Sequence, residues 1–207
     1  MNSPYYLVRL NRVDLVTLSA VPTTLLSMAL SLAHRPLFAI SLLFIAMLSD
    51  ALDGMLARHL GLVRPFGRYL DGFMDVLIYL LSPTLILYGE GFNGIWSAGL
   101  IVMVGCGLIR LAVFNETGNV EDAQGGLAYR GMPVFWSLFL LAGMQLMLVV
   151  LPLNLWRLLM LIMLLLFSHA MLLNRPFFKF TRLGQILTIT LGGALFFGCW
   201  GLFDRMS

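Results

Sequence analysis

The chain has 207 residues, of which 60% are hydrophobic and 11% are charged, and its formal net charge at pH 7 is +3. Soluble domains carry about 25% charged residues, so this composition argues against a soluble enzyme, a nucleic-acid-binding protein and a disordered chain. The sequence therefore predicts an integral membrane protein with the lipid bilayer, and no nucleic acid, as its partner.

The N-terminal segment is polar and aromatic, without an apolar stretch of signal-peptide length. Tyr5 and Tyr6 lie there close to Arg9 and Arg12. This mixture of aromatic and basic side chains is typical of a helix at the membrane surface. Residues 1–12 are therefore expected to form a short interfacial amphipathic helix.

Apolar runs of about 20 residues, the length needed to cross the hydrocarbon core, follow along the chain. They span 14–33, 36–57, 69–89, 95–114, 132–151, 153–173 and 183–203. Seven crossings are predicted, with six as the alternative. Because no repeat, low-complexity tract or long linker divides the sequence, residues 1–207 are expected to form one all-α domain, with a polytopic membrane helical bundle over 14–203.

Basic residues are unevenly distributed between the two predicted sides of the membrane. One side has Arg9, Arg12, Arg58, Arg64, Arg68, Arg110, Arg130, Arg175, Lys179 and Arg182, and the other has Arg35, Arg157 and Arg205. Cytoplasmic loops retain Lys and Arg, so the N-terminus is predicted to be cytoplasmic. Arg64 and Lys179 then face the cytoplasm and Asn93 the opposite side.

Four of the ten acidic residues lie close together at the inner ends of the second and third predicted helices. They are Asp50, Asp53, Asp71 and Asp75. An aspartate in the middle of a membrane costs ~2.5 to 3.5 kcal/mol on insertion scales, and less near the interface. A cluster of four therefore requires a compensating interaction.

The aspartates belong to two stripes of acidic and small residues. The stripes are Asp50, Asp53, Gly54 and Ala57 on one helix, and Gly67, Asp71 and Asp75 on the next. At about 100° per residue each stripe occupies one helix face, and the short loop His59 to Phe66 lets the two faces meet. The small residues either admit a ligand close to the backbone or serve ordinary helix packing.

Converging carboxylates cannot all remain ionised unless cations lie among them. Oxygen ligands without histidine or cysteine favour Mg²⁺, Mn²⁺ or Ca²⁺ over zinc. Mg²⁺ together with a phosphate-bearing substrate is the natural interpretation.

The full pattern reads Asp50-x-x-Asp53-Gly54-x-x-Ala57-Arg58, eight residues, then Gly67-x-x-x-Asp71-x-x-x-Asp75. It resembles, position for position, the signature of the CDP-alcohol phosphotransferase family of membrane enzymes. The resemblance implies a helical membrane fold of about six spans, two divalent ions (Mg²⁺ or Mn²⁺) and a homodimer. It also implies transfer of a phosphoalcohol from a CDP-alcohol to a hydroxyl group, with release of CMP.

The resemblance also implies roles for individual residues. Asp50, Asp53 and Asp71 correspond to metal ligands, and Asp75 to the catalytic base, which can also contact a metal. The residues that correspond to the CDP-alcohol site are Asp53, Gly54, Ala57, Arg58 and Gly67. For Arg58 the alternative to a diphosphate contact is an ion pair with the aspartates, and for Gly67 it is simply the start of a helix.

A second resemblance concerns the acceptor. Arg110-Leu111-Ala112-Val113-Phe114-Asn115 is similar to the RLARFN-type segment of the phosphatidylserine synthase branch, with Val113 where that branch usually has a second arginine. Gly131-Met132-Pro133 resembles the Gly-Leu-Pro that follows in the same branch, although Tyr129 to Trp136 is also similar to bacterial phosphatidylcholine synthases. The expected reaction is transfer of a phosphatidyl group from CDP-diacylglycerol to L-serine, with choline, glycerol 3-phosphate or inositol phosphate as alternative acceptors.

Three residues are candidates for acceptor binding. Arg110 is a charged residue within a predicted membrane helix, and such residues usually serve a function because they are costly there. Its guanidinium could bind a serine carboxylate. Asn115 could bind a polar head group, and Arg130 a phosphate. The alternative for both arginines is a purely topological role in the positive-inside pattern.

A divalent-cation transporter is the competing class, because intramembrane carboxylates also mark ion pathways. A conduction path needs polar groups through the whole membrane, whereas Ala39 to Met47 and Val76 to Leu81 are almost wholly apolar. This distribution favours an enzyme in the inner (cytoplasmic) membrane, with its active site just inside the cytoplasmic face.

Overall fold

The structure is a computed structural model that describes residues 8–118, 120–121, 127–178, 180 and 182–204. Its elements are α1 (Arg12–Leu32), α2 (Pro36–His59), α3 (Pro65–Asp75), the π-helix η1 (Val76–Leu81), α4 (Ser82–Gly89), the 3₁₀-helix η2 (Gly94–Ser97), α5 (Ala98–Thr117), β1 (Val120–Glu121), β2 (Leu127–Arg130), α6 (Trp136–Leu148), α7 (Leu153–Leu172), β3 (Pro176–Phe177) and α8 (Leu183–Asp204). The predicted polytopic helical bundle is confirmed.

Six helical segments among the described residues are long and apolar enough to cross a membrane. One of them is the continuous stretch Pro65–Gly89, in which α3, η1 and α4 follow one another without a break. The predicted run 132–151 contains only α6, whose 13 residues span roughly 20 Å at 1.5 Å per residue, against a hydrocarbon core of about 30 Å. The described residues therefore contain six helices of spanning length, and the predicted fifth run contains the shorter helix α6, which leads to the end of the bundle where Arg157 of α7 donates to the carbonyl of Gly91 at 2.8 Å.

Backbone chemistry explains why α6 begins late. Gly131 has a φ of 73°, a conformation that side-chain-bearing residues avoid, and Pro133 has no N–H to donate. The start of the predicted run is therefore a non-helical entry segment.

The N-terminus of α1 differs from its prediction. Residues 1–7 of the predicted interfacial helix 1–12 lie outside the described part, and residues 8–11 are not helical. Asn11 caps α1 instead: its side chain accepts the N–H of Asp14 at 2.9 Å, and the Asp14 carboxylate accepts the N–H of Asn11 at 2.7 Å. This reciprocal capping box fixes where the membrane helix starts.

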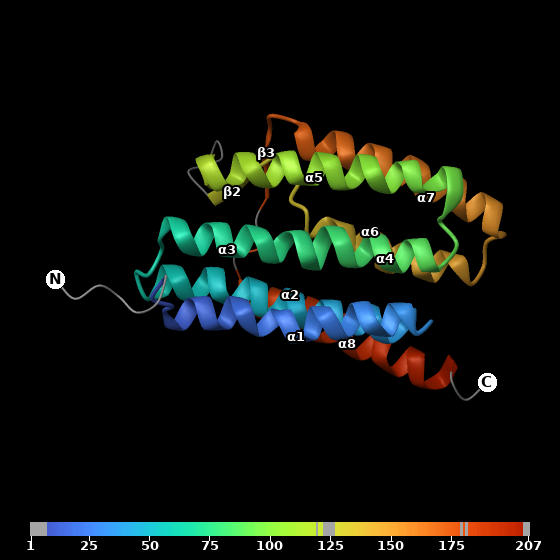
Figure 1. The fold of residues 1–207 in the computed structure, drawn as a ribbon, viewed down its shortest axis with the longest axis horizontal. Helices are drawn as coiled ribbons and strands as arrows, with labels where there is room; N and C mark the ends of the chain where they lie inside the picture. Colours follow the sequence, from blue (N-terminus) through green and yellow to red (C-terminus); the bar gives the residue numbers. More distant parts are fainter. Residues whose placement is uncertain (1–7, 119, 122–126, 179, 181, 205–207) are drawn as a thin grey trace.

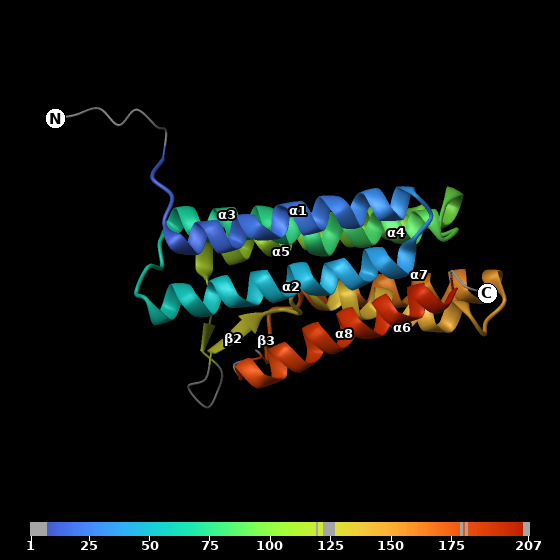
Figure 2. The ribbon, with the colours of Figure 1, turned by 90° about the horizontal axis from the view of Figure 1, so that it is seen from below.

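The long helices run side by side along the long axis of the molecule (Figure 1). α2 packs against both α1 and α8, and α5 packs against α7; Figure 2 shows α8 alongside α2. Fully buried apolar side chains, among them Ile40, Leu43, Ile78 and Leu138, form the core between these helices. The loop between α2 and α3 lies at one end of the bundle, and the loops after α1 and α4 lie at the other (Figure 1).

A small antiparallel sheet of order β1-β2-β3 joins the segment after α5 to the segment after α7. Tyr129 pairs with Phe177, and the N–H of Gly131 donates to the carbonyl of Arg175 at 2.9 Å. A Cβ at Gly131 would lie 2.4 Å from the carbonyl oxygen of Met171. Only glycine fits there, and this contact holds β2 against the bundle.

Candidate active site

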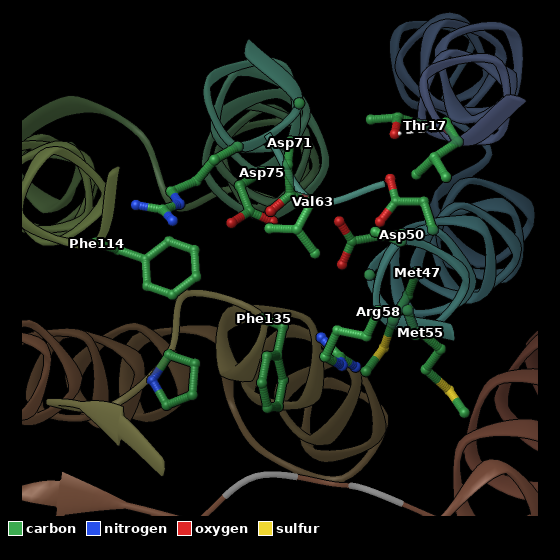
Figure 3. A pocket seen from close by; sticks show the side chains of 18 of the residues that line it. Thr17, Met47, Asp50, Met55, Arg58, Val63, Asp71, Asp75, Phe114 and Phe135 are labelled. Carbon is green, nitrogen blue, oxygen red and sulfur yellow. Dashed lines mark hydrogen bonds between the residues drawn. The ribbon is translucent and has the colours of Figure 1, made fainter. Parts of the chain in front are cut away.

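A pocket of about 340 Å³ lies among α1, α2, α3 and α5, near the end of the bundle that carries the α2–α3 loop. It is lined by all four predicted aspartates and by the four other residues predicted to bind a CDP-alcohol: Asp50, Asp53, Asp71, Asp75, Gly54, Ala57, Arg58 and Gly67. Figure 3 shows Asp50 of α2 facing Asp71 and Asp75 of α3 across this space. Phe114 and Phe135, from two further segments, border the same space. The two stripes meet as the helical spacing predicts.

Three of the aspartates approach one another closely enough to share a cation. Asp50, Asp53 and Asp71 each contribute a carboxylate oxygen, and these oxygens all lie within 4.8 Å of one another. Metal–oxygen distances of about 2.0 to 2.6 Å allow two ligands of one ion to be up to roughly 5 Å apart. The donor set consists of hard oxygens, which suits Mg²⁺, Mn²⁺ or Ca²⁺.

Asp53 provides an independent indication of a ligand. The residue is 3% exposed, and its Oδ2 atom has no hydrogen-bond partner among the described residues. A buried carboxylate oxygen is costly unless it is hydrogen-bonded or coordinates a cation. The residues present therefore fit a divalent cation.

Asp75 lies one helical turn beyond Asp71 and is buried. It interacts electrostatically with Asp50, with Asp71 and with the guanidinium of Arg110. It is not among the three aspartates whose oxygens meet. Asp75 therefore lies near both the acidic cluster and a cationic group.

Arg110 of α5 is the basic residue of the predicted acceptor set that lines the pocket. It is 5% exposed, and its Cζ lies 5.1 Å from the centre of the Phe114 ring and 5.4 Å from that of Tyr129. Loss of solvation raises the pKa of the Tyr129 hydroxyl above its usual range, so this ring remains a neutral aromatic partner. The two rings hold the guanidinium in place by cation–π contacts.

The guanidinium of Arg110 has an edge available for a ligand. Its Nε and Nη2 atoms are buried without a hydrogen-bond partner in the described part of the chain. Together they form the side of the fork that binds a carboxylate or phosphate through two parallel hydrogen bonds. Arg110 is thus preorganised for an anion beside Asp75.

The other two predicted acceptor residues lie outside the pocket lining. The side-chain amide of Asn115 packs so closely against Gly72 of α3 that a Cβ on Gly72 would lie 2.8 Å from Nδ2 of Asn115. The backbone carbonyl of Asn115 accepts a hydrogen bond from Arg68 at 3.2 Å. Arg130 is exposed, whereas its neighbour Tyr129 lines the pocket. Successive residues of a strand point to opposite faces, so β2 turns Tyr129 inward and Arg130 outward.

Sequence reasoning missed the contribution of α1 to the pocket. Asp14 and Thr17 both line it, and Asp14, only 1% exposed, forms an ion pair with Arg64. Arg64 also donates to the carbonyl of Arg9 at 3.1 Å. The Asn11-x-x-Asp14 capping pattern in the sequence could have indicated that this aspartate has a defined place.

Part of the pocket wall is apolar. It includes Met47 and Met55 of α2 and Ile186 and Ile189 of α8. The pocket is therefore amphipathic, with charged groups on α2, α3 and α5 and hydrocarbon side chains toward α8. Such a surface suits a ligand with a phosphate head and an apolar tail.

The fold and the pocket together define a multi-pass membrane protein with an acidic pocket whose carboxylates are compatible with a divalent cation. The family model described as CDP-alcohol phosphatidyltransferase matches residues 10–202, and the chain belongs to this family. The resemblance of the aspartate pattern to the CDP-alcohol phosphotransferase signature is thereby confirmed.

Curated relatives share about 30% identity with the chain. A CDP-diacylglycerol–serine O-phosphatidyltransferase of Methanocaldococcus jannaschii is 30% identical over 63% of this chain and 58% of its own length. An archaetidylserine synthase of Methanothermobacter thermautotrophicus is 30% identical over 58% of this chain and 52% of its own. A CDP-diacylglycerol–serine O-phosphatidyltransferase of Helicobacter pylori is 30% identical over 58% and 51%. The chain spans about half the length of these relatives.

Proposed function

We propose that the protein transfers a phosphatidyl group from CDP-diacylglycerol to the hydroxyl of L-serine, which yields phosphatidylserine and CMP. The observation that carries the serine assignment is the guanidinium edge of Arg110, which is buried near Asp75 and has no hydrogen-bond partner among the described residues. Serine has the carboxylate that this edge would bind, whereas choline has none. The names of the relatives, which include serine O-phosphatidyltransferases and an archaetidylserine synthase, support the same acceptor.

The proposed reaction is a displacement at phosphorus. The serine hydroxyl oxygen forms a bond to the phosphorus that carries the diacylglycerol, and the bond from that phosphorus to the bridging oxygen of the diphosphate breaks. CMP leaves with the electron pair of the broken bond. Asp75, which lines the pocket beside Arg110, takes the proton of the hydroxyl as general base.

Asp50, Asp53 and Asp71 would hold the divalent cation, Mg²⁺ or Mn²⁺, and the family resemblance implies two such ions. When bound, a divalent cation supplies charge neutralisation for the diphosphate and for the departing CMP. Arg58, Gly54, Ala57 and Gly67 line the same pocket; the small residues leave room for the nucleotide diphosphate, and the guanidinium of Arg58 suits its oxygens.

The apolar wall of the pocket supports a lipid donor. Its side chains, on α2 and α8, line the same pocket as the aspartates. The diphosphate of CDP-diacylglycerol would lie at the aspartates, and its glycerol and acyl chains would lie toward α8. A divalent-cation transporter accounts less well for this arrangement, because Ile40, Leu43 and Ile78 are fully buried in an apolar core beyond the aspartates.

We further infer that the protein resides in the inner membrane as a homodimer, with the N-terminus and the pocket on the cytoplasmic side. The excess of basic residues near the end of the bundle that carries the pocket supports this orientation. The homodimer follows from the family resemblance, and a mass measurement of the purified protein in detergent tests it.

The decisive experiment supplies purified protein with CDP-diacylglycerol and Mn²⁺ or Mg²⁺ and offers the candidate acceptors in parallel. Serine, choline, glycerol 3-phosphate and inositol phosphate are each assayed for CMP release and for the lipid product. We expect serine to give the highest rate. Preference for another acceptor would overturn the serine assignment, and an absence of CMP release with all of them would overturn the proposed activity.

A further inference from the structure

Tyr79 lines the acidic pocket, although it lies within the apolar run 76–81. Its side chain is 1% exposed, and its hydroxyl donates a 2.7 Å hydrogen bond to Oδ2 of Asp50. A buried tyrosine hydroxyl usually finds a hydrogen-bond partner. Here that partner is one of the three carboxylates that converge on a single point.

The π-helix explains how Tyr79 reaches this position. In an α-helix a residue four places further on is rotated by 40°, so the stripe of Gly67, Asp71 and Asp75 drifts around α3. The turn η1 (Val76–Leu81) is wider, because its hydrogen bonds join residues five apart. The extra residue per turn reduces the drift and keeps Tyr79 on the face that carries Asp71 and Asp75.

Neighbouring side chains hold Tyr79 in place. The hydroxyl of Ser137 on α6 donates to the carbonyl of Tyr79, and the hydroxyl of Ser82 donates to the carbonyl of Leu77 at 2.8 Å. The ring of Tyr79 lies edge-to-face against Phe135, with 6.5 Å between centroids. The wide turn, its backbone and the phenol ring therefore have a fixed arrangement.

We propose that Tyr79 is a positioning residue for the metal site. Its hydrogen bond fixes the rotation of the Asp50 carboxylate, so that Asp50 meets Asp53 and Asp71 at one cation. The inference rests on the proposed function, in which these three aspartates bind the ion. Groups that hydrogen-bond to metal ligands typically contribute about 10- to 100-fold to metal affinity.

The test measures Mn²⁺ binding directly, without turnover. Mn²⁺ is added stepwise to the purified protein, and the concentration of unbound Mn²⁺ is measured by electron paramagnetic resonance. Tyr79→Phe removes only the hydroxyl, and we expect its dissociation constant for Mn²⁺ to rise about 10- to 100-fold. The matched control is Tyr88→Phe, which removes the same group from an exposed tyrosine on α4 and should bind Mn²⁺ like the wild type.

Turnover provides a second readout. In Tyr79→Phe the Mn²⁺ concentration for half-maximal CMP release should rise by the same factor. The KM for CDP-diacylglycerol, measured at saturating Mn²⁺, should stay within about twofold of the wild type, because the hydroxyl acts on the ligand sphere. A merely structural role would lower the thermal unfolding midpoint without moving the Mn²⁺ constant.

Unchanged Mn²⁺ affinity in Tyr79→Phe would overturn the inference while leaving the proposed function intact. A wild-type protein that binds no Mn²⁺ would overturn both. If Tyr79→Phe cannot be purified, Ser137→Ala replaces it, since this variant releases the Tyr79 carbonyl but keeps the hydroxyl. It should also weaken Mn²⁺ binding, by a smaller factor, and wild-type affinity in it would count against the inference.

Discussion

Replacing Arg110 with alanine should impair the use of serine selectively. In the described structure Nε and Nη2 of Arg110 have no hydrogen-bond partner, so a carboxylate bound there would accept two charge-assisted hydrogen bonds. Each contributes ~1.5 to 3 kcal/mol, roughly 3 to 6 kcal/mol for two, and truncating one partner of a buried charge pair costs ~2 to 5 kcal/mol. The overlap, about 3 to 5 kcal/mol, corresponds to a loss of roughly 150-fold to several thousandfold in kcat/KM for serine.

The assay is CMP release at varied serine and fixed, saturating CDP-diacylglycerol and Mn²⁺. Arg110→Lys keeps the charge but not the two-pronged geometry, so it should lose one hydrogen bond of ~1.5 to 3 kcal/mol, about 10- to 150-fold. The KM for CDP-diacylglycerol should change little in both variants, because the proposed diphosphate contacts are on α2 and α3. The control is Arg35→Ala, an exposed arginine in the loop between α1 and α2, which lies at the other end of the bundle (Figure 1).

Two results would refute this reasoning. The first is an Arg110→Ala variant whose kcat/KM for serine stays within about threefold of the wild type, since a deleted carboxylate partner costs more than that. The second is an equal loss with serine and with choline, which has neither a carboxylate nor a phosphate. In that case Arg110 contributes to the fold or to the donor site, and the serine assignment loses its structural support.

The remaining predictions test the metal site, the close contact at Gly131 and the orientation in the membrane. Excess EDTA should abolish CMP release and added Mn²⁺ should restore it; turnover that persists in EDTA contradicts the metal site. Asp53→Asn keeps the shape of the side chain but removes a negatively charged metal ligand, so CMP release should fall about 100-fold or more while the melting temperature stays unchanged. Near-normal activity would exclude Asp53 from the metal site. Gly131→Ala places a Cβ 2.4 Å from a backbone oxygen at a φ of 73°, so it should cost roughly 3 kcal/mol of stability in thermal unfolding. The control is Gly143→Ala, where a Cβ would meet no described atom within 4 Å beyond its chain neighbours and its own helix backbone; equal melting temperatures would contradict the steric argument. In a cysteine-free background, His59→Cys and Asn93→Cys should react from opposite sides of sealed vesicles, and labelling of position 59 from outside intact cells would invert the proposed orientation.

The convergence of the aspartates could be predicted because it depends on local geometry. The spacing of Asp50 and Asp53 on one helix, and of Asp71 and Asp75 on the next, follows from 3.6 residues per turn, and a short loop forces the two helices to be neighbours. Both conditions can be read from the sequence. The structure accordingly places all four residues in one pocket.

Features that depend on contacts between distant segments could not be predicted. The inward direction of Tyr129 and the outward direction of Arg130 are set by pairing of β2 with β3, more than 40 residues further along the chain. Asn115 has the residue type of a head-group ligand, but its side-chain amide packs against Gly72 of α3 and does not line the pocket. Tyr79 lies in an apolar run, and only the wide turn of η1 brings its hydroxyl to Asp50.

The apolar wall of the pocket has a consequence for kinetics. Met47 and Ile189 line the same pocket as the aspartates, so the proposed donor, a lipid with acyl chains, would reach the site by diffusing within its own leaflet. The proposed acceptor and the nucleotide product, in contrast, would exchange with water. The rate should therefore follow the mole fraction of donor lipid in the vesicle rather than its bulk concentration, so that diluting the donor with an inert phospholipid slows the reaction and adding buffer does not.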